Sequence, residues 1–191
     1  MGCVMRLKSL IVLLFVLLVG CGSSESFKPD TFSEDDLAIV KVDDEKQIVK
    51  YGMSREDAEK ILGPSKTDKE LFPKYDFGVQ IIYRDDKVVA IGLTEDSEGV
   101  YKSSRGAEVG MKKEGVKKLY SEKYGLSVFE QDLDYIYDSR AKRYLGKVSA
   151  DQPTKDEGEL VDTYLASFRF DDNGDADSIF LSDRLAAVQM R

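Results

Sequence analysis

The sequence contains no histidine and no tryptophan, and its two cysteines, Cys3 and Cys21, both lie near the start of the chain. After residue 21 there is therefore neither an imidazole nor a thiol. This excludes a Ser-His-Asp triad, a cysteine nucleophile, a histidine general base and the usual Cys/His zinc site. It also excludes a disulfide framework, so a packed hydrophobic core must hold the fold. With 42% hydrophobic residues, a body of about 155 residues is long enough to build one.

The chain also lacks a hydrophobic run long enough to span a bilayer. The run from Leu10 to Val19 has ten residues, whereas a transmembrane helix needs about 20. Basic residues precede this run, at Arg6 and Lys8, and a small residue follows it. This is the layout of a secretory signal.

The four residues Leu18-Val19-Gly20-Cys21 resemble the lipobox of bacterial lipoproteins. The resemblance implies that residues 1–20 are a signal peptide removed before Cys21, and that Cys21 carries a lipid on its sulfur. The two or three acyl chains of such proteins anchor them far more firmly than a single chain does. We therefore expect a lipid-anchored protein on the extracytoplasmic face of the cell membrane. An uncleaved anchor or a plain secretory signal is the alternative, and Met5 is an alternative start of the chain.

The charge of the chain limits its partners. The formal net charge of −8 becomes −10 when residues 1–20, which include Arg6 and Lys8, are removed. Affinity for nucleic acid comes largely from Lys and Arg that neutralise phosphates, so nucleic acid is not an expected partner. Anionic lipid headgroups should repel an acidic body, which leaves the lipid on Cys21 to hold it at the membrane.

Composition divides the chain into four parts. After the signal peptide of residues 1–20, residues 21–36 are small, polar and acidic, which is typical of a flexible tether. Residues 37–99 are expected to form a first α+β unit. Residues 100–191 are expected to form a second one, which contains a polar insertion at 138–158.

The best-defined local element runs from Gly52 to Pro64. Ser54 is a good N-cap residue, and Asp57 three residues later gives a variant of the capping box. The apolar residues of the segment fall on one face at helical spacing: Ala58, Ile61 and Leu62. Gly63-Pro64 is a strong stop signal. The segment therefore predicts a short amphipathic helix that is stabilised mainly by packing.

A second segment, from Gly110 to Tyr120, repeats the glycine, methionine, glutamate and lysine of the first one 58 residues later. We expect its helix to continue to Tyr124. Lys112 stands where the first segment has the capping Ser54, so the second helix should begin less firmly. We interpret the pair as an internal repeat. Chance similarity of two amphipathic helices is the alternative.

Runs of alternating or β-branched residues predict antiparallel strands after each helix. These runs are residues 79–83 and 88–93 after the first helix, and 133–137, 164–170 and 178–181 after the second. Two shorter runs, 37–42 and 47–50, precede the first helix. A final helix with Ser182 as its cap is expected at the end of the chain, with a frayed end as the alternative.

These segments resemble the unit shared by β-lactamase inhibitory protein and the small lipoprotein of the outer-membrane barrel-assembly machine. The residues that carry the resemblance are 52–64, 79–83 and 88–91 in the first copy, and 105–110 and 123–125 in the second. It implies an α+β fold of two tandem helix-plus-antiparallel-hairpin units. The helices would pack on one face of an antiparallel sheet and leave the other face open. Members of this group bind unrelated partners, so the resemblance implies no common active site.

Aromatic residues on or beside the expected strands are the candidate partner-binding residues: Tyr75, Tyr83, Tyr135, Tyr137 and Phe168. On an open sheet face, such side chains would anchor a partner. The alternative is that they are ordinary core or edge residues, because strands favour aromatic side chains.

The acidic turn from Asp171 to Asp177 alternates oxygen-bearing side chains in the manner of a calcium-binding loop. Ala176 and Ser182 stand where such a loop has its glycine and its glutamate. We interpret the turn as a solvated hairpin, with a weak calcium site as the alternative. No cofactor and no metal are expected.

Together these patterns predict a non-enzymatic module that binds an unidentified protein partner or assists assembly at the cell envelope. A cell-wall or glycan hydrolase that uses Asp and Glu as acid and base is the first alternative, although no spacing selects a pair of carboxylates. A calcium-responsive binding module is the second. No catalytic residue is assigned.

Overall fold

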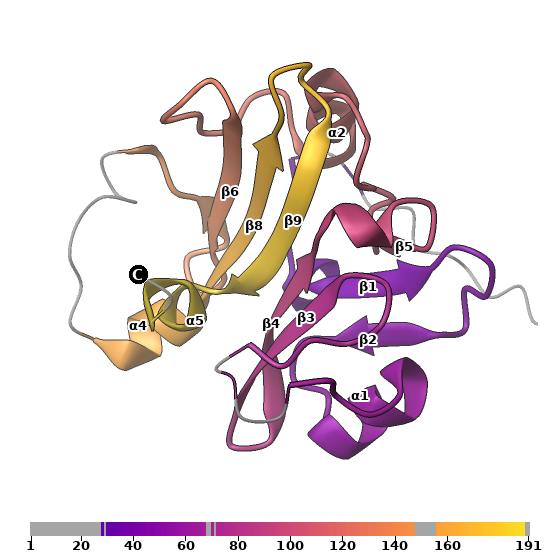
Figure 1. The fold of residues 1–191 in the computed structure, drawn as a ribbon. Helices are drawn as coiled ribbons and strands as arrows, with labels where there is room; N and C mark the ends of the chain where they lie inside the picture. Colours follow the sequence, from indigo (N-terminus) through magenta and orange to yellow (C-terminus); the bar gives the residue numbers. More distant parts are fainter. Residues whose placement is uncertain (1–27, 29, 68–69, 71, 148–155, 190–191) are drawn as a thin grey trace, which may run out of the picture.

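The computed structural model describes the following residues (Figure 1): 28, 30–67, 70, 72–147 and 156–189. The expected signal peptide, the lipidation site Cys21 and the tether up to residue 27 lie outside the described residues. Within the described part of the chain, no helix has both the length and the hydrophobicity that crossing a membrane requires.

Two antiparallel sheets organise the fold (Figure 1). The larger sheet has six strands, in the order β3 (Val79–Arg84), β4 (Lys87–Leu93), β9 (Ala176–Asp183), β8 (Thr163–Phe170), β6 (Asp132–Asp138) and β7 (Arg143–Tyr144). The smaller sheet has three, in the order β2 (Ile48–Lys50), β1 (Ala38–Lys41) and β5 (Tyr101–Ser103). Pairing of β4 with β9 joins the hairpins of the two halves into one sheet. We expected a single sheet, but β1 and β2 pair with β5 and form a second one.

The described helices are α1 (Arg55–Leu62), α2 (Lys113–Tyr120), α4 (Glu157–Val161) and α5 (Arg184–Gln189), with 3-10 turns η1 (Glu34–Asp36) and η2 (Glu95–Ser97). Helices α1 and α2 contribute to the same core as the inner face of the large sheet. Helix α5 lies against the opposite face, where Ala186 packs with Ile82 and Ala90. The chain is therefore α+β, as the sequence predicts, but the second face of the sheet is covered at one end.

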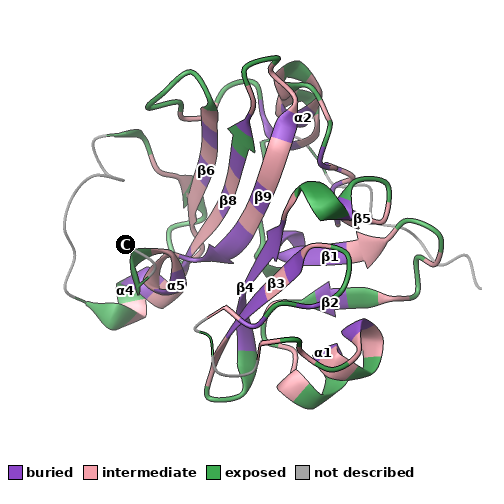
Figure 2. Ribbon diagram, in the orientation of Figure 1, coloured by how far each residue is buried: buried purple, intermediate pink, exposed green. Residues whose placement is uncertain are grey.

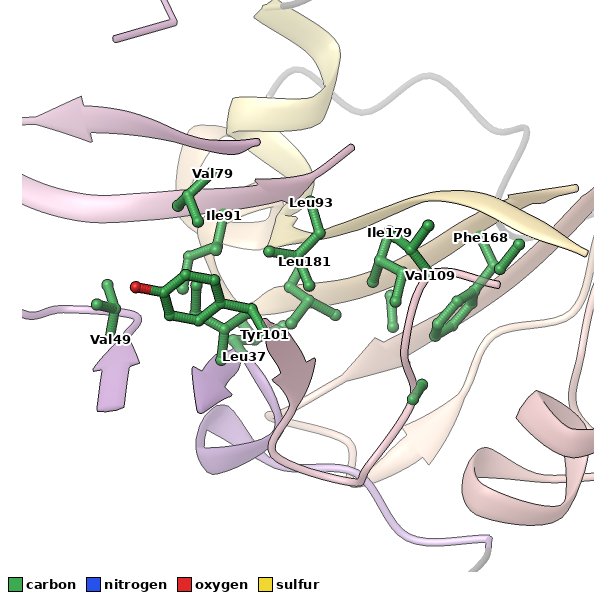
Figure 3. Close-up of a cluster of buried hydrophobic side chains, with 14 of the residues drawn as sticks. Leu37, Val49, Val79, Ile91, Leu93, Tyr101, Val109, Phe168, Ile179 and Leu181 are labelled. Atoms are coloured by element: carbon green, nitrogen blue, oxygen red, sulfur yellow. The ribbon is translucent and has the colours of Figure 1, made fainter. Parts of the chain in front are cut away.

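The main core lies between the two sheets (Figure 3). Leu37, Val49 and Tyr101 point from the smaller sheet and its flanks towards Ile91 and Leu181 of the larger one. In β8 and β6, buried and more exposed residues alternate (Figure 2), because successive side chains of a strand point to opposite faces. Each large apolar side chain buried in this way stabilises the fold by about 1.5–3 kcal/mol.

The prediction for the first helix is confirmed at both ends. The backbone N–H of Asp57 donates to Ser54 Oγ at 3.2 Å, which is the predicted N-cap. Gly63 follows the last helical residue with a φ of +80°, and its N–H donates to the carbonyl of Glu59 at 2.9 Å. Glycine adopts this positive φ without the steric cost that a Cβ would add.

Two helix boundaries differ from the prediction. Helix α2 ends at Tyr120 rather than Tyr124, because Ser121 is extended and its Oγ accepts the N–H groups of two following residues at 3.0 and 3.1 Å. At the end of the chain, the cap of α5 is Asp183 and not Ser182. Asp183 is the last residue of β9 and directly precedes α5, and its Oδ1 accepts the N–H of Ala186 at 2.7 Å. Ser182 lies one residue earlier, and its buried Oγ has no hydrogen-bond partner among the described residues.

Each of the two helices is joined to its hairpin by the same backbone hydrogen bonds. Gly52 N–H donates to Val88 O at 2.8 Å and Val88 N–H to Met53 O at 2.9 Å, while Gly110 N–H donates to Ala176 O at 2.7 Å and Ala176 N–H to Met111 O at 2.9 Å. Both glycines have a positive φ, of +74° and +84°. The first residue of each helix also places a cation over an aromatic ring of its hairpin: Arg55 over Tyr83 at 4.0 Å and Lys113 over Phe170 at 5.4 Å.

The segment before β1 belongs to the folded body. Phe32 is only 4% exposed and Asp36 only 1%. The carboxylate of Asp36 pairs with the guanidinium of Arg105, at 2.7 Å to Nε and 3.1 Å to Nη2. We expected a flexible tether through residue 36, but an aromatic ring and a carboxylate with buried partners order its last part. Such a tether therefore ends before residue 30.

The polar insertion at 138–158 is only partly irregular. It contains β7, which pairs with the end of β6, and the first residues of α4. Residues 148–155 lie outside the described part. The insertion adds one short edge strand to the large sheet and brings Tyr144 opposite Tyr137.

Candidate functional site

The five aromatic residues singled out in the sequence do not share one surface. Tyr75, Tyr135 and Phe168 are buried, with at most 3% of each exposed. Tyr83 and Tyr137 are partly buried at the border of the core. Successive side chains of β6 and β8 alternate between the two faces of the sheet, and this alternation places Tyr135 and Phe168 on the buried face. The hypothesis of partner anchors on an open sheet face is therefore not supported for the three buried residues, which are core residues.

The structure brings Tyr75 and Tyr83 together. Their hydroxyl oxygens are 2.7 Å apart, and Tyr75 also donates to Glu59 Oε1 at 3.2 Å. The guanidinium of Arg55 covers the ring of Tyr83. Burial raises the pKa of both tyrosine hydroxyls. This is a satisfied polar contact between α1 and β3, and it leaves no tyrosine directed at a partner.

Of the five predicted residues, Tyr137 lines a cavity. We call this cavity the tyrosine cleft; its volume is about 410 Å³, and its lining residues are Asp30, Thr31, Tyr124, Tyr137, Lys142, Arg143 and Tyr144. The size is in the range of small-molecule sites in proteins. It lies where the segment before β1 meets β7 and the end of β6.

Three tyrosine rings form one wall of the tyrosine cleft. Tyr124 and Tyr144 are stacked, with ring centroids 4.5 Å apart and an angle of 12° between the planes. Tyr137 meets Tyr144 edge-on, at 5.2 Å and 76°. Burial raises the pKa of the Tyr144 hydroxyl, and this hydroxyl donates to the carbonyl of Thr31 at 2.8 Å. The rings thus make a rigid corner with two perpendicular planes.

Arg105 holds the segment that contributes Asp30 and Thr31 to the lining of the cleft. Its guanidinium donates to the carbonyls of Lys28, at 3.3 Å, and of Thr31. The N–H of Asp30 donates to the carbonyl of Tyr120 at 3.1 Å, and Asp30 Oδ1 accepts the hydroxyl of Ser121. The segment is therefore attached through both its backbone and its side chains, and the shape of the cleft is set before any ligand binds.

The charged groups of the tyrosine cleft make few ion pairs or hydrogen bonds with the described residues. Lys142 and Arg143 are exposed, and among the described residues neither forms an ion pair. Asp30 uses one carboxylate oxygen for Ser121. The charges of the lining side chains sum to +1, whereas the whole chain carries −8. The cleft is thus a locally cationic site on an acidic protein.

Two residues of the tyrosine cleft have an unfavourable backbone conformation. Asp30 has a φ of +67° and Lys142 a φ of +52°. Aspartate tolerates this region, but lysine is rarely found there. Such strained positions are often found at binding sites. Here the conformation of Lys142 directs the chain from the turn after β6 into β7.

Replacing Lys142 by glycine should raise the free energy of unfolding by about 0.5–1 kcal/mol, because the left-handed conformation costs an L-residue about 1–2 kcal/mol and glycine less. Urea denaturation measures this change. Lys46 is the matched control, since it is also an exposed lysine in a turn but does not have a positive φ. Lys46→Gly should leave stability unchanged or lower it, and an equal loss in both variants would contradict the strain at Lys142.

Sequence reasoning missed most of the tyrosine cleft. Tyr124 was expected to extend a helix, and Asp30 to lie in a tether. A usable signal was present in the stretch Lys142-Arg143-Tyr144, where two adjacent cations precede an aromatic residue on an acidic chain. It did not reveal a site, because the residues that complete the cleft lie far away in the chain.

Two carboxylates of the acidic turn between β8 and β9, those of Asp171 and Asp175, have partners in the structure. Asp171 Oδ1 accepts the N–H groups of Asn173 and Asp175, both at 2.9 Å. The hydrogen bond from the backbone of Asp175 contributes most to holding the pKa of the Asp171 carboxyl below its usual range. Asp175 Oδ2 pairs with Lys112 Nζ at 2.7 Å. In the described part of the chain, no group of three or more acidic side chains is arranged to hold a metal ion.

Comparison of the chain with protein-family models, with curated proteins and with solved structures finds no match in any of them. No family is therefore assigned. The likeness to β-lactamase inhibitory protein and the small barrel-assembly lipoprotein stays a prediction from the sequence.

Proposed function

We propose that the protein is a lipoprotein of the cell envelope, anchored through Cys21 on the extracytoplasmic face of a membrane, and that it acts without catalysis as a protein-binding or assembly module. The tyrosine cleft is a site where this module binds a component of the envelope. The observation that carries this proposal is a preformed cavity of about 410 Å³ that is lined by three tyrosines and by two cations with no ion pair among the described residues. Tyrosine and arginine are the residue types that contribute most to protein recognition sites.

The position of the cleft fits an anchored protein. Asp30 lines the cleft and follows Cys21 by nine residues. An extended chain of that length reaches at most about 30 Å. A lipid on Cys21 would therefore keep the cleft close to the membrane surface, where envelope components are concentrated and a weak site gains from proximity.

We also propose that the two helix-plus-hairpin units are tandem copies of one ancestor. The equivalent hydrogen bonds at Gly52 and Gly110 support this, as do the two cation-over-ring contacts. Core positions also correspond, since Ile91 and Ile179 are both buried at equivalent places of β4 and β9. In this interpretation, β6, β7 and α4 are additions to the second copy. Strands β6 and β7 and the turn between them supply four of the seven residues that line the tyrosine cleft.

The anchor is tested by mass spectrometry of the protein isolated from cells. The expected mature chain begins at Cys21 with a diacylglyceryl group, and Cys21→Ser should release the protein from the membrane fraction. An intact amino end without lipid, in cytosolic protein, would contradict the anchor.

The cleft is tested by site-specific photo-cross-linking in the intact envelope. Benzoylphenylalanine replaces Ala141, an exposed residue beside Lys142 that does not line the cleft itself. A discrete adduct is expected from this position, and Arg143→Glu should abolish it. Benzoylphenylalanine at the exposed Lys46, in the β1–β2 turn, is the control. The same adduct from both positions, or none from position 141, would count against the cleft as the binding site.

A further inference from the structure

Some polar groups of the tyrosine cleft have hydrogen-bonding or ion-pairing capacity that the described residues do not satisfy. These groups indicate the chemistry of its ligand. Tyr144 and Thr31 already donate their hydroxyl hydrogens to backbone carbonyls, at 2.8 and 2.6 Å. The cations of Lys142 and Arg143 have no carboxylate partner among the described residues. Asp30 Oδ2 accepts no hydrogen bond from the described residues. The cleft therefore offers two cationic donors and one anionic acceptor beside aromatic planes.

An apolar ligand does not fit this lining, because it would strip water from three charged groups and replace none of their hydrogen bonds. A polyacidic ligand does not fit either. The lining side chains carry a net charge of +1, and Asp30 would repel a second negative group. The lining matches a ligand with one negative charge, a hydroxyl that can donate to Asp30, and a ring with apolar faces.

We propose that the tyrosine cleft binds an acidic saccharide, which is a sugar ring that carries one carboxylate. The carboxylate meets Arg143 and Lys142, since a guanidinium binds a carboxylate through two parallel hydrogen bonds. The ring lies in the corner between Tyr137 and Tyr144, whose planes meet at 76°. A hydroxyl of the sugar donates to Asp30. This inference takes the cleft as a binding site from the proposed function, but it depends neither on the anchor nor on a protein partner.

The rigidity of the cleft lining favours the binding of a small ligand such as a single sugar. The stacked and edge-on contacts hold the tyrosine rings, and Arg105 holds the backbone of the lining residue Thr31. A preformed site loses little conformational entropy on binding, which matters for a ligand with few atoms. The exposed cations are screened by water, so the affinity of a single sugar should be in the millimolar range.

The experiment is a titration followed by amide chemical shifts and by calorimetry. It uses the chain from residue 21 onwards with Cys21→Ser, because the core residues all lie between Phe32 and Ala186. The probes are two matched pairs, glucuronate with glucose and N-acetylmuramate with N-acetylglucosamine. At least one acid should bind about tenfold more tightly than its neutral counterpart, with shift changes at Tyr124, Tyr137 and residues 142–144.

Variants localise the contacts. Arg143→Gln and Lys142→Gln should each weaken binding of the acid by roughly fivefold to tenfold. Lys46→Gln and Lys50→Gln, exposed positions in and beside the small sheet, should leave it unchanged. Both cleft cations are exposed, so circular dichroism should show unchanged folding in every variant.

Four outcomes would overturn the proposal. These are no binding of either acid up to about 20 mM, equal binding of acid and neutral sugar, equal binding of inorganic phosphate, and tighter binding of hexaglutamate. Phosphate binding would reduce the cleft to a general anion site, and hexaglutamate binding would indicate an acidic protein segment. None of these results bears on lipidation or on the cross-link at position 141, so failure of this inference is distinguishable from failure of the proposed function.

Discussion

Replacing Asp36 by alanine should lower the free energy of unfolding by about 3–5 kcal/mol, because it leaves the charge of Arg105 buried without its counter-charge. Both side chains of this pair are only 1% exposed. Asp36 Oδ2 also accepts the N–H of Ser33 at 2.6 Å, so the substitution removes a backbone partner as well. Equilibrium unfolding in urea measures the loss.

The pair between Lys102 and Glu45 is the control. Its side chains are 25% and 75% exposed, with 3.0 Å between the charged atoms. Exposed pairs of this kind contribute about 0–1 kcal/mol, so Glu45→Ala should have little effect. Equal losses in the two variants would show that Asp36 does not hold the segment before β1. A loss confined to Asp36→Ala should be accompanied by weaker binding in the tyrosine cleft, since Arg105 also holds the cleft wall at Thr31.

Phe168→Ala should lower the free energy of unfolding by about 3–5 kcal/mol, through lost burial and the cavity that remains. Phe168 is fully buried and meets Tyr120 edge-on, with ring centroids 5.0 Å apart. A third ring, Tyr135, lies 6.3 Å away. Thermal and urea unfolding of the variant measure the effect. Phe129→Ala is the control, because its ring is 65% exposed and surface substitutions usually change stability by less than about 0.5 kcal/mol.

Phe168 was also a candidate partner-binding residue, and one substitution separates the two roles. Phe168→Leu keeps an apolar side chain of similar size and should lower stability by only about 1–1.5 kcal/mol. If Phe168 is a core residue, the cross-link from position 141 should persist in this variant. Loss of the cross-link with the fold intact would restore Phe168 as a partner contact.

Local features of the fold were predictable because the interactions behind them span few residues. Ser54, Asp57 and Gly63 determine both ends of α1 through contacts at most four residues apart. The hairpin of β3 and β4 follows from two apolar runs around a two-residue turn at Asp85 and Asp86, both with positive φ. The alternation in β8 correctly predicts that Ala166, Phe168 and Phe170 share one face.

The predicted helix boundaries were wrong where a group distant in the sequence changed the local conformational preference. Ser121 looks like a helical residue in the sequence, but its hydroxyl donates to Asp30, and that contact accompanies the end of α2. Serine is a common cap residue, but the pairing of β9 with β4 and β8 continues past Ser182. Helix α5 therefore begins one residue later than expected, and Asp183 caps it.

The amino-acid sequence by itself determined much of the short-range structure: α1, the strands other than β5 and β7, and the repeated Gly-Met segments. It also determined the absence of histidine and thiol chemistry after residue 21. Only the tertiary structure decided that β1 and β2 pair with β5, that Phe32 and Asp36 are buried, and that a cationic cleft forms. The physical reason is that the residues that meet in these features are far apart along the chain. The cleft joins Asp30 to Tyr144 through Arg105 and β6, and a contact between residues more than a hundred positions apart leaves no periodic trace in the sequence.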